Sequence, residues 1–304
     1  MRVGTILPHL GPAASPETIV RSAQAAEALD YDSLWVAERL LYPLQPRTKY
    51  PGTPDGSLPG FYKGVFEPIE TLTWVAAHTK KIRLGTSVLN MPFHNPALLA
   101  RRLATLDVLS GGRLNVGLGQ GWLQDEYLAA GAPTSGLAAR ADEFVAVLRA
   151  MWGPDPVSHQ GPHFQVAPSI IRPKPVQQSV PIYLAAFAPS ALARVAQYAD
   201  GWLPTGIPLA ATGQMMGQVR KMATAAGRDP AALKLIVLGH VTPTDAPLGE
   251  GRADFTGSLD EIRHDVDAAR EIGADILVLN PGATPGTETE AGFNRVQELL
   301  RPLA

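Results

Sequence analysis

The sequence contains no cysteine among its 304 residues. That absence excludes disulfide bonds, zinc sites with thiolate ligands, iron–sulfur clusters and a catalytic thiol. The seven histidines show neither HxH nor HExxH spacing, so the sequence predicts no histidine metal site. The formal net charge is only −2, which gives no reason to expect nucleic acid or a membrane surface as a partner.

Long apolar runs are also missing. No stretch approaches the roughly 20 apolar residues that a membrane-spanning helix needs. The chain opens with Met1-Arg2-Val3-Gly4 and continues into a strand-like run, not into the apolar core of a secretion signal. We therefore expect a cytoplasmic protein, and a composition of 45% hydrophobic and 18% charged residues provides for a large core.

Short apolar runs alternate with helical patterns along the whole chain. The predicted buried strands are Val3–Leu7, Ser33–Ala37, Ile82–Leu89, Leu114–Leu118, Val180–Ala185, Trp202–Leu203, Leu233–Val241 and Ile276–Asn280. The predicted helices are Pro16–Leu29, Pro68–Thr79, Pro96–Leu109, Gln124–Ala130, Leu137–Trp152, Pro189–Tyr198, Thr212–Ala226, Ser258–Ile272 and Glu288–Leu300. Ser258 with Glu261 three residues later is a capping box.

Strict alternation with apolar strands indicates a parallel sheet. Eight strand–helix units predict an α/β fold of the (β/α)8 TIM-barrel type, as a single domain over residues 1–304. An open doubly wound sheet is the alternative. It normally has a glycine-rich turn after its first strand, where this chain has Pro8-His9-Leu10-Gly11-Pro12.

Two segments interrupt the alternation. Residues 40–65, after the second strand, are rich in proline, glycine and tyrosine and have no helical period. They form either a disordered surface loop or a lid, and their aromatic side chains favour a lid over the active site. Residues 153–175 are predicted to form a hairpin excursion before the fifth strand.

The active site of a parallel barrel lies at the C-terminal ends of its strands. The strand-end residues are Pro8 and His9, Glu38 and Arg39, Thr86 to Asn90 with His94, Gly119 to Trp122, Ala186 to Ser190, Thr205, His240, and Asn280. No GxSxG or GxxxxGK[ST] motif is present. His9 and His94 are candidates for proton transfer, because histidine titrates near neutral pH, and a structural role is the alternative for each.

Glycines follow the fourth predicted strand in Gly117-Leu118-Gly119-Gln120-Gly121. The run lacks the full glycine spacing of a dinucleotide-binding turn. Two interpretations remain open: close backbone packing at a strand end, or room for a planar ring to approach the backbone.

One long stretch is distinctive, and it spans two strands and the helix between them. It comprises Ile82-Arg83-Leu84-Gly85-Thr86-Ser87-Val88-Leu89, Pro92-Phe93-His94-Asn95-Pro96, Leu103-Ala104-Thr105-Leu106-Asp107-Val108-Leu109-Ser110-Gly111-Gly112-Arg113 and Gly117-Leu118-Gly119-Gln120-Gly121-Trp122. It resembles the bacterial luciferase-like superfamily. Pro181-Ile182-Tyr183-Leu184-Ala185-Ala186 and Ala199-Asp200-Gly201-Trp202 extend the resemblance over nearly the whole chain.

The superfamily holds monooxygenases that use reduced flavin and oxidoreductases that use the deazaflavin coenzyme F420. This chain most resembles the F420-dependent branch, in which Leu34-Trp35-Val36-Ala37-Glu38 followed by a long Pro/Tyr-rich loop is typical.

The resemblance implies a cofactor site. A non-proline cis peptide between Ser87 and Val88, next to Thr86, would lie behind the ring, and Gly119 and Gly121 would let the ring approach. The phosphate would lie at the backbone N–H groups of Ala186, Phe187 and Ala188, at the start of the next helix, with the hydroxyl of Ser190 as a further donor. Relatives often have a glycine in this loop, where this chain has Phe187-Ala188.

The chain departs from the sugar-phosphate dehydrogenases of the superfamily. Those enzymes have an Asp-His pair where this chain has Glu38-Arg39, and an acid where it has Trp122. We therefore expect no sugar-phosphate substrate. Arg39 would hold an anionic group of cofactor or substrate, or would pair with Glu38. Glu38 is expected near the ring, and Asp125 and Glu126 have the alternative of only capping or solvating a helix start.

The leading functional hypothesis is hydride transfer between F420 and a small organic substrate, fairly hydrophobic in view of the aromatic lid, with His94, His9 and Glu38 as candidate catalytic residues. The first alternative is a two-component monooxygenase that receives reduced FMN from a partner reductase and activates dioxygen. The second is a non-catalytic protein that binds a flavin or F420. Relatives are commonly dimers, so a homodimer is expected.

Overall fold

Eight parallel strands close into a barrel in the computed structural model, which describes residues 1–284 and 286–301. The strands follow the order β3-β2-β1-β13-β10-β9-β8-β5, and β3 also pairs with β5, which closes the ring. The barrel strands are β1 (Arg2–Ile6), β2 (Ser33–Val36), β3 (Arg83–Thr86), β5 (Leu114–Gly119), β8 (Ile182–Leu184), β9 (Gly201–Trp202), β10 (Lys234–His240) and β13 (Ile276–Asn280). The predicted TIM barrel is therefore confirmed, and the open sheet is excluded.

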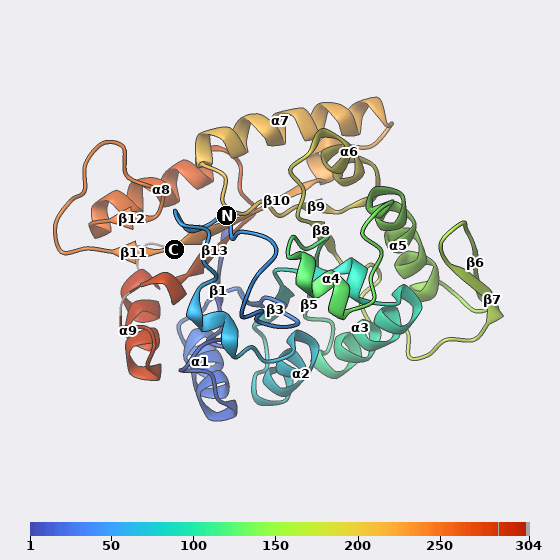
Figure 1. Ribbon diagram of the computed structural model, residues 1–304, viewed down its shortest axis with the longest axis horizontal. Coiled ribbons are helices and arrows are strands. Elements are labelled where there is room, and N and C mark those ends of the chain that lie inside the picture. Colours follow the sequence, from blue (N-terminus) through green and yellow to red (C-terminus); the bar gives the residue numbers. More distant parts are fainter. Residues whose placement is uncertain (285, 302–304) are drawn as a thin grey trace.

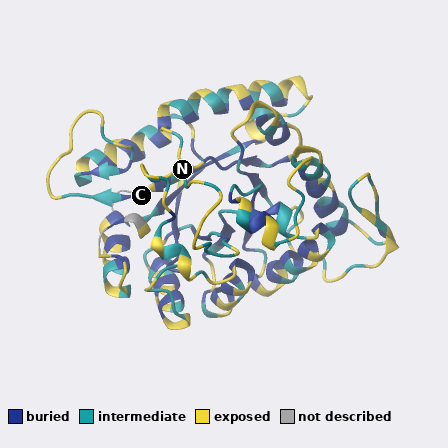
Figure 2. Ribbon diagram, in the orientation of Figure 1, coloured by how far each residue is buried: buried dark blue, intermediate teal, exposed yellow. Residues whose placement is uncertain are grey.

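Helices surround the strands, except for the short α4 (Gln124–Ala129), which lies over the middle of the barrel in the view of Figure 1. The other helices are α1 (Pro16–Ala28), α2 (Pro68–His78), α3 (Pro96–Ser110), α5 (Leu137–Trp152), α6 (Pro189–Tyr198), α7 (Leu209–Ala225), α8 (Leu259–Glu271) and α9 (Glu290–Leu300). Buried residues gather in the strands and on the helix faces turned toward them (Figure 2). No helix in the described ranges is both long and apolar enough to cross a membrane.

Local sequence sets where the helices begin. Asn95 caps α3 by accepting hydrogen bonds from two first-turn N–H groups, and Pro96 follows at a position where proline is favourable. Ser258 and Glu261 form the predicted capping box at the start of α8. The start of α6 is different, because its N-cap residue Ala188 has no side-chain oxygen to bind the first-turn N–H groups.

The barrel interior has its own small core. Its buried residues are Ile6, Trp35, Tyr183, Leu203, Ile236, Ile276 and Val278. Trp35 is fully buried, and its ring lies so close to β3 that a Cβ at Gly85 would be 2.4 Å from the indole. Glycine at position 85 is therefore the residue that lets this tryptophan fill the barrel.

The third barrel strand is interrupted where the sequence predicted one continuous strand, Ile82–Leu89. It consists of β3 and β4 (Leu89–Asn90), and both pieces pair with β5. Gly85 pairs with Asn115 and Leu89 with Leu118, so the third strand has one more residue between these pairs than β5 has. That extra residue is a bulge, and it falls at the end of the barrel where the active site is expected.

Two excursions leave the barrel. The predicted hairpin is present as β6 (Val157–Gln160) and β7 (Gln165–Ser169), which pair antiparallel and project at one edge of the molecule (Figure 1). After β10, the short strands β11 (Thr242–Pro243) and β12 (Thr256–Gly257) pair beside the loop that joins them.

At the end of the barrel away from the active site, a buried arginine connects the end of α2 to the start of β5. Arg113, just before β5, is only 9% exposed. Its guanidinium donates hydrogen bonds of 2.7–3.2 Å to Ser110 O, Thr79 Oγ1, Ile82 O, Ala76 O and Thr79 O. The side chain thus satisfies carbonyl groups at the end of α2, which have no partner within the helix.

We predict that Arg113→Met lowers the free energy of unfolding by about 3 kcal/mol, because the buried acceptors lose their donor. Chemical denaturation of the purified protein measures this change. Arg101→Met, on the exposed face of α3, is the control and should change the free energy by less than about 0.5 kcal/mol. Equal stability of the two variants would show that the guanidinium is not a structural tie.

Candidate active site

A buried carboxylate connects the ends of the second and third barrel strands. Glu38 follows β2 and is 4% exposed. Its Oε2 accepts a 2.6 Å hydrogen bond from the backbone N–H of Asn90, and its own N–H donates to Val88 O at 3.3 Å. Glu38 is therefore held directly against the Val88–Asn90 backbone.

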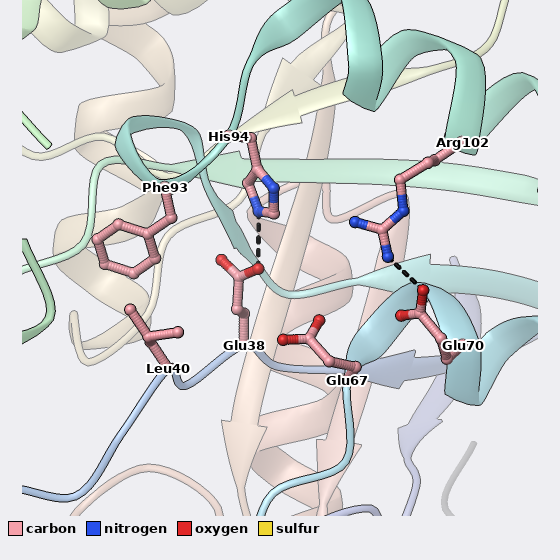
Figure 3. A pocket seen from close by; sticks show the side chains of 7 residues that line it. All are labelled: Glu38, Leu40, Glu67, Glu70, Phe93, His94 and Arg102. Carbon is pink, nitrogen blue, oxygen red and sulfur yellow. Dashed lines mark hydrogen bonds and ion pairs between the residues drawn. The ribbon is translucent and has the colours of Figure 1, made fainter. Parts of the chain in front are cut away.

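His94 completes this arrangement. It follows the short 3-10 turn Met91–Phe93, and its Nε2 lies 2.7 Å from Glu38 Oε1 (Figure 3). The His94 side chain is 14% exposed, so the imidazole is partly open. The structure thus brings together two of the predicted catalytic residues, a histidine and the carboxylate that orients it.

A cavity of about 200 Å³ lies beside this pair. Its lining residues are Glu38, Leu40, Glu67, Glu70, Phe93, His94 and Arg102 (Figure 3). Glu70 is bound to Arg102 in an ion pair. Glu67 is exposed to solvent on one side, but the residues packed around its carboxyl group displace part of its water and raise its pKa, and the nearby charges of Glu38 and Glu70 raise it further. Sequence reasoning missed Glu67, Glu70 and Arg102 because they lie on helices α2 and α3 and not at strand ends.

Arg39 pairs with Glu126 and not with the Glu38 carboxylate. Its Nη1 lies 3.0 Å from Glu126 Oε2, and its Nε donates to the backbone carbonyl of Glu38. Glu126 is fully buried, and its Oε1 accepts a 2.7 Å hydrogen bond from Leu40 N. Burial raises the pKa of Glu126, while Arg39 and the N–H groups of Leu40 and Leu41 oppose that shift.

Glu126 therefore does more than cap a helix start. Its neighbour Asp125 also binds the 40–65 segment, because its carboxylate accepts a 2.9 Å hydrogen bond from the backbone N–H of Arg47.

Aromatic side chains pack around Arg39. The guanidinium carbon lies 5.0 Å from the Trp122 ring centre and 5.4 Å from that of Tyr62. Tyr50 packs on Trp122 at 5.3 Å and edge-on to Tyr62 at 5.9 Å. These contacts place the 40–65 segment, including η1 (Gly60–Lys63), against the glycine turn after β5. Its action as a lid stays a prediction.

His9 has a different environment from His94. It is fully buried, its Nδ1 lies 2.8 Å from Leu7 O, and its Nε2 lies 2.9 Å from Ala37 N. The neutral tautomer with a proton on Nδ1 satisfies both contacts. Burial lowers the pKa of His9, which keeps the ring neutral. With both nitrogens bonded to the backbone, this geometry favours a structural role, and the predicted role of His9 in proton transfer stays a prediction.

The bulge in the third strand has the cis peptide that the resemblance implied. The Ser87–Val88 bond is cis. Before it, Thr86 Oγ1 donates to Gly117 O at 2.8 Å and accepts from Gly117 N at 2.9 Å. Next to it, a Cβ at Gly119 would lie 2.6 Å from Val88 Cγ2. Because Gly119 has no Cβ, the Val88 side chain fits beside it.

Two features beside the bulge fit the predicted position of a cofactor ring. Gly121 has a φ of +78°, and a Cβ there would lie 3.3 Å from Asn90 Oδ1. Asn90 Nδ2 is buried and has no hydrogen-bond partner among the described residues. A donor left without a partner beside a glycine turn fits a site that receives a polar ring edge.

The end of β8, which lies on the other side of β5 from the third strand, is suited to an anion. Ala186 is buried, Phe187 is 51% exposed and Ser190 is exposed at the first turn of α6. Because Ala188 provides no side-chain cap, the first N–H groups of α6 are available to a ligand. The predicted phosphate position is thus chemically suitable.

A third histidine, His240, also lies at the barrel mouth. Asn280 Nδ2 lies 3.1 Å from His240 Nδ1. His240 reaches solvent but is surrounded by strand ends, which displace water and lower its pKa.

We predict that His9→Gln lowers the free energy of unfolding at neutral pH by about 1–3 kcal/mol, because two buried backbone groups lose their partner. The lowered pKa makes wild-type stability fall as the pH decreases below 6.5, since only the unfolded chain readily takes up the proton. The glutamine variant lacks this loss, so the difference between the two proteins should shrink on acidification. Denaturation curves across that pH range measure it, and a constant difference would contradict the structural role.

Comparison with known proteins agrees with this geometry. The model of the luciferase-like monooxygenase family matches residues 1–275. The F420-dependent glucose-6-phosphate dehydrogenase of Amycolatopsis mediterranei (strain U-32) is 31% identical over 221 residues, which cover 69% of this chain and 60% of the relative.

Two solved structures share the fold. The monooxygenase RslO1 from Streptomyces bottropensis has a TM-score of 0.80 at 22% identity, with 99% of this chain and 98% of that chain covered. An F420-dependent secondary alcohol dehydrogenase, solved with an F420–acetone adduct, has a TM-score of 0.79 at 17% identity, with coverage of 100% and 98%. The predicted resemblance, including the likeness to the F420-dependent branch, is confirmed. This chain belongs to the luciferase-like monooxygenase family.

Proposed function

We propose that this protein is an F420-dependent oxidoreductase that transfers hydride between the deazaflavin and a small, largely apolar organic substrate. The observation that carries the proposal is the hydrogen bond between His94 and Glu38 at the bulged end of the third barrel strand. In this proposal, His94 is the proton donor near the glycine-lined surface where the ring would lie. The 31% identity to an F420-dependent relative supports the deazaflavin over FMN.

The residues present fit the cofactor at both of its ends. The backbone of Thr86, Ser87 and Val88, with Gly119 and Gly121 opposite, would support the ring. The N–H groups from Ala186 to Ala188, the uncapped start of α6 and the Ser190 hydroxyl would hold the phosphate. When bound, F420 supplies or accepts the hydride, and the protein contributes position, charge and exclusion of water.

We assign proton transfer to His94. When a carbonyl carbon gains a hydride, its oxygen also needs a proton, and an oriented imidazole suits that task at neutral pH. Glu38 accepts from His94 Nε2 and thereby fixes the ring orientation. Glu38 in turn is fixed by the N–H of Asn90. The same pair takes up the proton when an alcohol is oxidised.

Arg39 is proposed to support the site indirectly. Its charge is already balanced by Glu126, and its guanidinium carbon lies over the rings of Trp122 and Tyr62. Its predicted contact with an anionic group of cofactor or substrate therefore requires an anion that approaches an existing ion pair. We assign Arg39 to the positioning of the 40–65 segment.

The substrate side of the site is aromatic. Trp122, Tyr50 and Tyr62 pack together beside the glycine turn. The acid of the sugar-phosphate branch is replaced by Trp122, so this wall has no carboxylate at that position. The sugar phosphate named for the Amycolatopsis relative is thus a poor match, and an apolar ketone or alcohol is a better one.

The cofactor assignment predicts that F420 binds at least tenfold more tightly than FMN, a difference of about 1.4 kcal/mol. Anaerobic fluorescence titration of the purified protein with each cofactor, oxidised and reduced, measures this. Tight binding of reduced FMN without binding of F420 would reject the proposal in favour of the two-component monooxygenase. Binding of F420 with no turnover of any apolar ketone or alcohol would favour the non-catalytic binding protein.

The phosphate position predicts a second result, for Ala188→Asp. Aspartate at this N-cap binds first-turn N–H groups and stabilises the protein by about 0.5–1 kcal/mol, yet its charge repels phosphate. F420 affinity should fall at least tenfold while thermal stability rises. Ala188→Asn is the matched control, because asparagine caps the helix without a charge and should lose less affinity. Unchanged F420 affinity in Ala188→Asp would place the phosphate elsewhere.

A further inference from the structure

The proposed hydride transfer leaves the cavity beside Glu38 and His94 unused. This cavity lies between the residues that follow β2, the loop after β4, the beginning of α2 and Arg102 on α3, and its volume of about 200 Å³ is enough for water molecules. Glu38 and His94 form one side of it, and the exposed residues Glu67 and Glu70 connect it to solvent. The cavity is thus a polar route from the surface to the proton-transfer pair.

We propose that Glu67 is the solvent-facing acid of a proton path that runs through this cavity to His94 and Glu38. The proposal rests on the function proposed above, in which His94 transfers a proton during each turnover. Glu67 acts through His94 and does not touch the substrate or the cofactor, so it is a relay residue and not a catalytic one.

The orientation of Glu67 is the first support. Glu67 occupies the N-cap position of α2, but its side chain does not cap the helix. Figure 3 shows its carboxylate pointing toward Glu38 and His94, away from the helix start. Glu70, one turn later, is instead bound to Arg102. Of the two acids at the cavity entrance, Glu67 is therefore the one placed to exchange protons.

The surrounding charges are the second support. Glu38 and Glu70 face Glu67 as carboxylates, and Arg102 and His94 face it as cationic or titratable groups. Partial loss of water around the carboxyl group and the two carboxylates raise the pKa of Glu67 above its ordinary value, and they outweigh the opposite effects of Arg102 and His94. A carboxyl group whose pKa lies closer to neutrality holds and releases a proton more readily under working conditions.

The proton count is complete without another reactant. For each carbonyl reduced, the carbon receives a hydride with two electrons and the oxygen receives one proton from His94. The Glu67 carboxylic acid returns a proton to His94 by way of Glu38 or cavity water, and solvent reprotonates Glu67. When an alcohol is oxidised, each proton moves in the opposite direction.

Exchange of the His94 Nε2 proton with water tests the relay without cofactor or substrate. It is measured by NMR in protein with ¹⁵N-labelled histidine, with the His94 signal assigned from its loss in His94→Gln. We expect Glu67→Gln to slow this exchange about tenfold, since the amide cannot donate and recover a proton. Glu17→Gln, an exposed acid in the first turn of α1, is the matched control and should exchange like the wild type.

Chemical rescue distinguishes a relay from a structural role. Added acetate should restore fast exchange in Glu67→Ala, because the small acid can enter the space that the side chain leaves, and it should not accelerate the wild type. Equal exchange rates in Glu67→Gln and the wild type, or no rescue by acetate, would overturn the proposal. Because no cofactor is present, such a failure leaves F420 binding intact, and a failure of F420 binding leaves the exchange result intact.

The pH dependence of stability provides a second measurement. A raised pKa means that the wild type loses stability as the pH rises above 4.5, the ordinary value of a glutamate. Glu67→Gln lacks this loss, so its stability relative to the wild type should increase from pH 4.5 toward neutrality and then level off. Glu17→Gln should show no such increase. A flat difference for Glu67→Gln would also overturn the proposal.

Discussion

The carboxylate of Glu38 is a buried charge, and a buried charge is tolerated only when hydrogen bonds replace its lost water. Its two partners, the Asn90 N–H and His94 Nε2, both come from the stretch of chain that ends the third barrel strand and leads out of it. Satisfying Glu38 therefore fixes the path of that chain across the barrel mouth. His94 is followed directly by Asn95, the N-cap of α3, so the same constraint also sets where the next helix begins.

The bulge in the third strand depends on the neighbouring β5. Thr86 and Gly117 exchange two hydrogen bonds, and a Cβ at Gly117 would lie 2.0 Å from Thr86 O. Gly119 similarly makes room for Val88. Close packing at Gly117 and Gly119 supports the backbone of the bulge, as the first interpretation of the glycine run expects. The second interpretation, room for a planar ring, stays a prediction.

The alternation of apolar runs was sufficient to predict all eight barrel strands, because strands buried on both faces need apolar side chains at nearly every position. It could not show the break between β3 and β4, since Ser87 and Val88 suit a strand as well as a bulge. Helix α7 begins at Leu209, three residues before the predicted start, because Pro208 and not a polar cap precedes it.

The sequence located some residues at the barrel mouth and missed others, for equally specific reasons. Glu38 and His94 were found because they follow strands, whereas Glu67 begins a helix and lies outside that rule. The partner of Arg39 was also missed, because Glu126 is 87 residues away in the sequence. The path of the 40–65 segment determines whether Arg39 pairs with Glu38 or with Glu126, and no local sequence pattern specifies that path.

The Arg39–Glu126 pair also explains how the two sides of the site differ. By neutralising each other and bonding to Leu40, these residues hold Tyr62 and Trp122 together without leaving a net charge beside the glycine turn. The acids that are not neutralised in this way, Glu38 and Glu67, lie on the side of His94. In the proposed function, an apolar substrate and the proton supply would then reach the reaction centre from different directions. That separation would keep the water of the cavity apart from the surface where hydride would pass, which suits a reaction in which hydride and proton must arrive at neighbouring atoms.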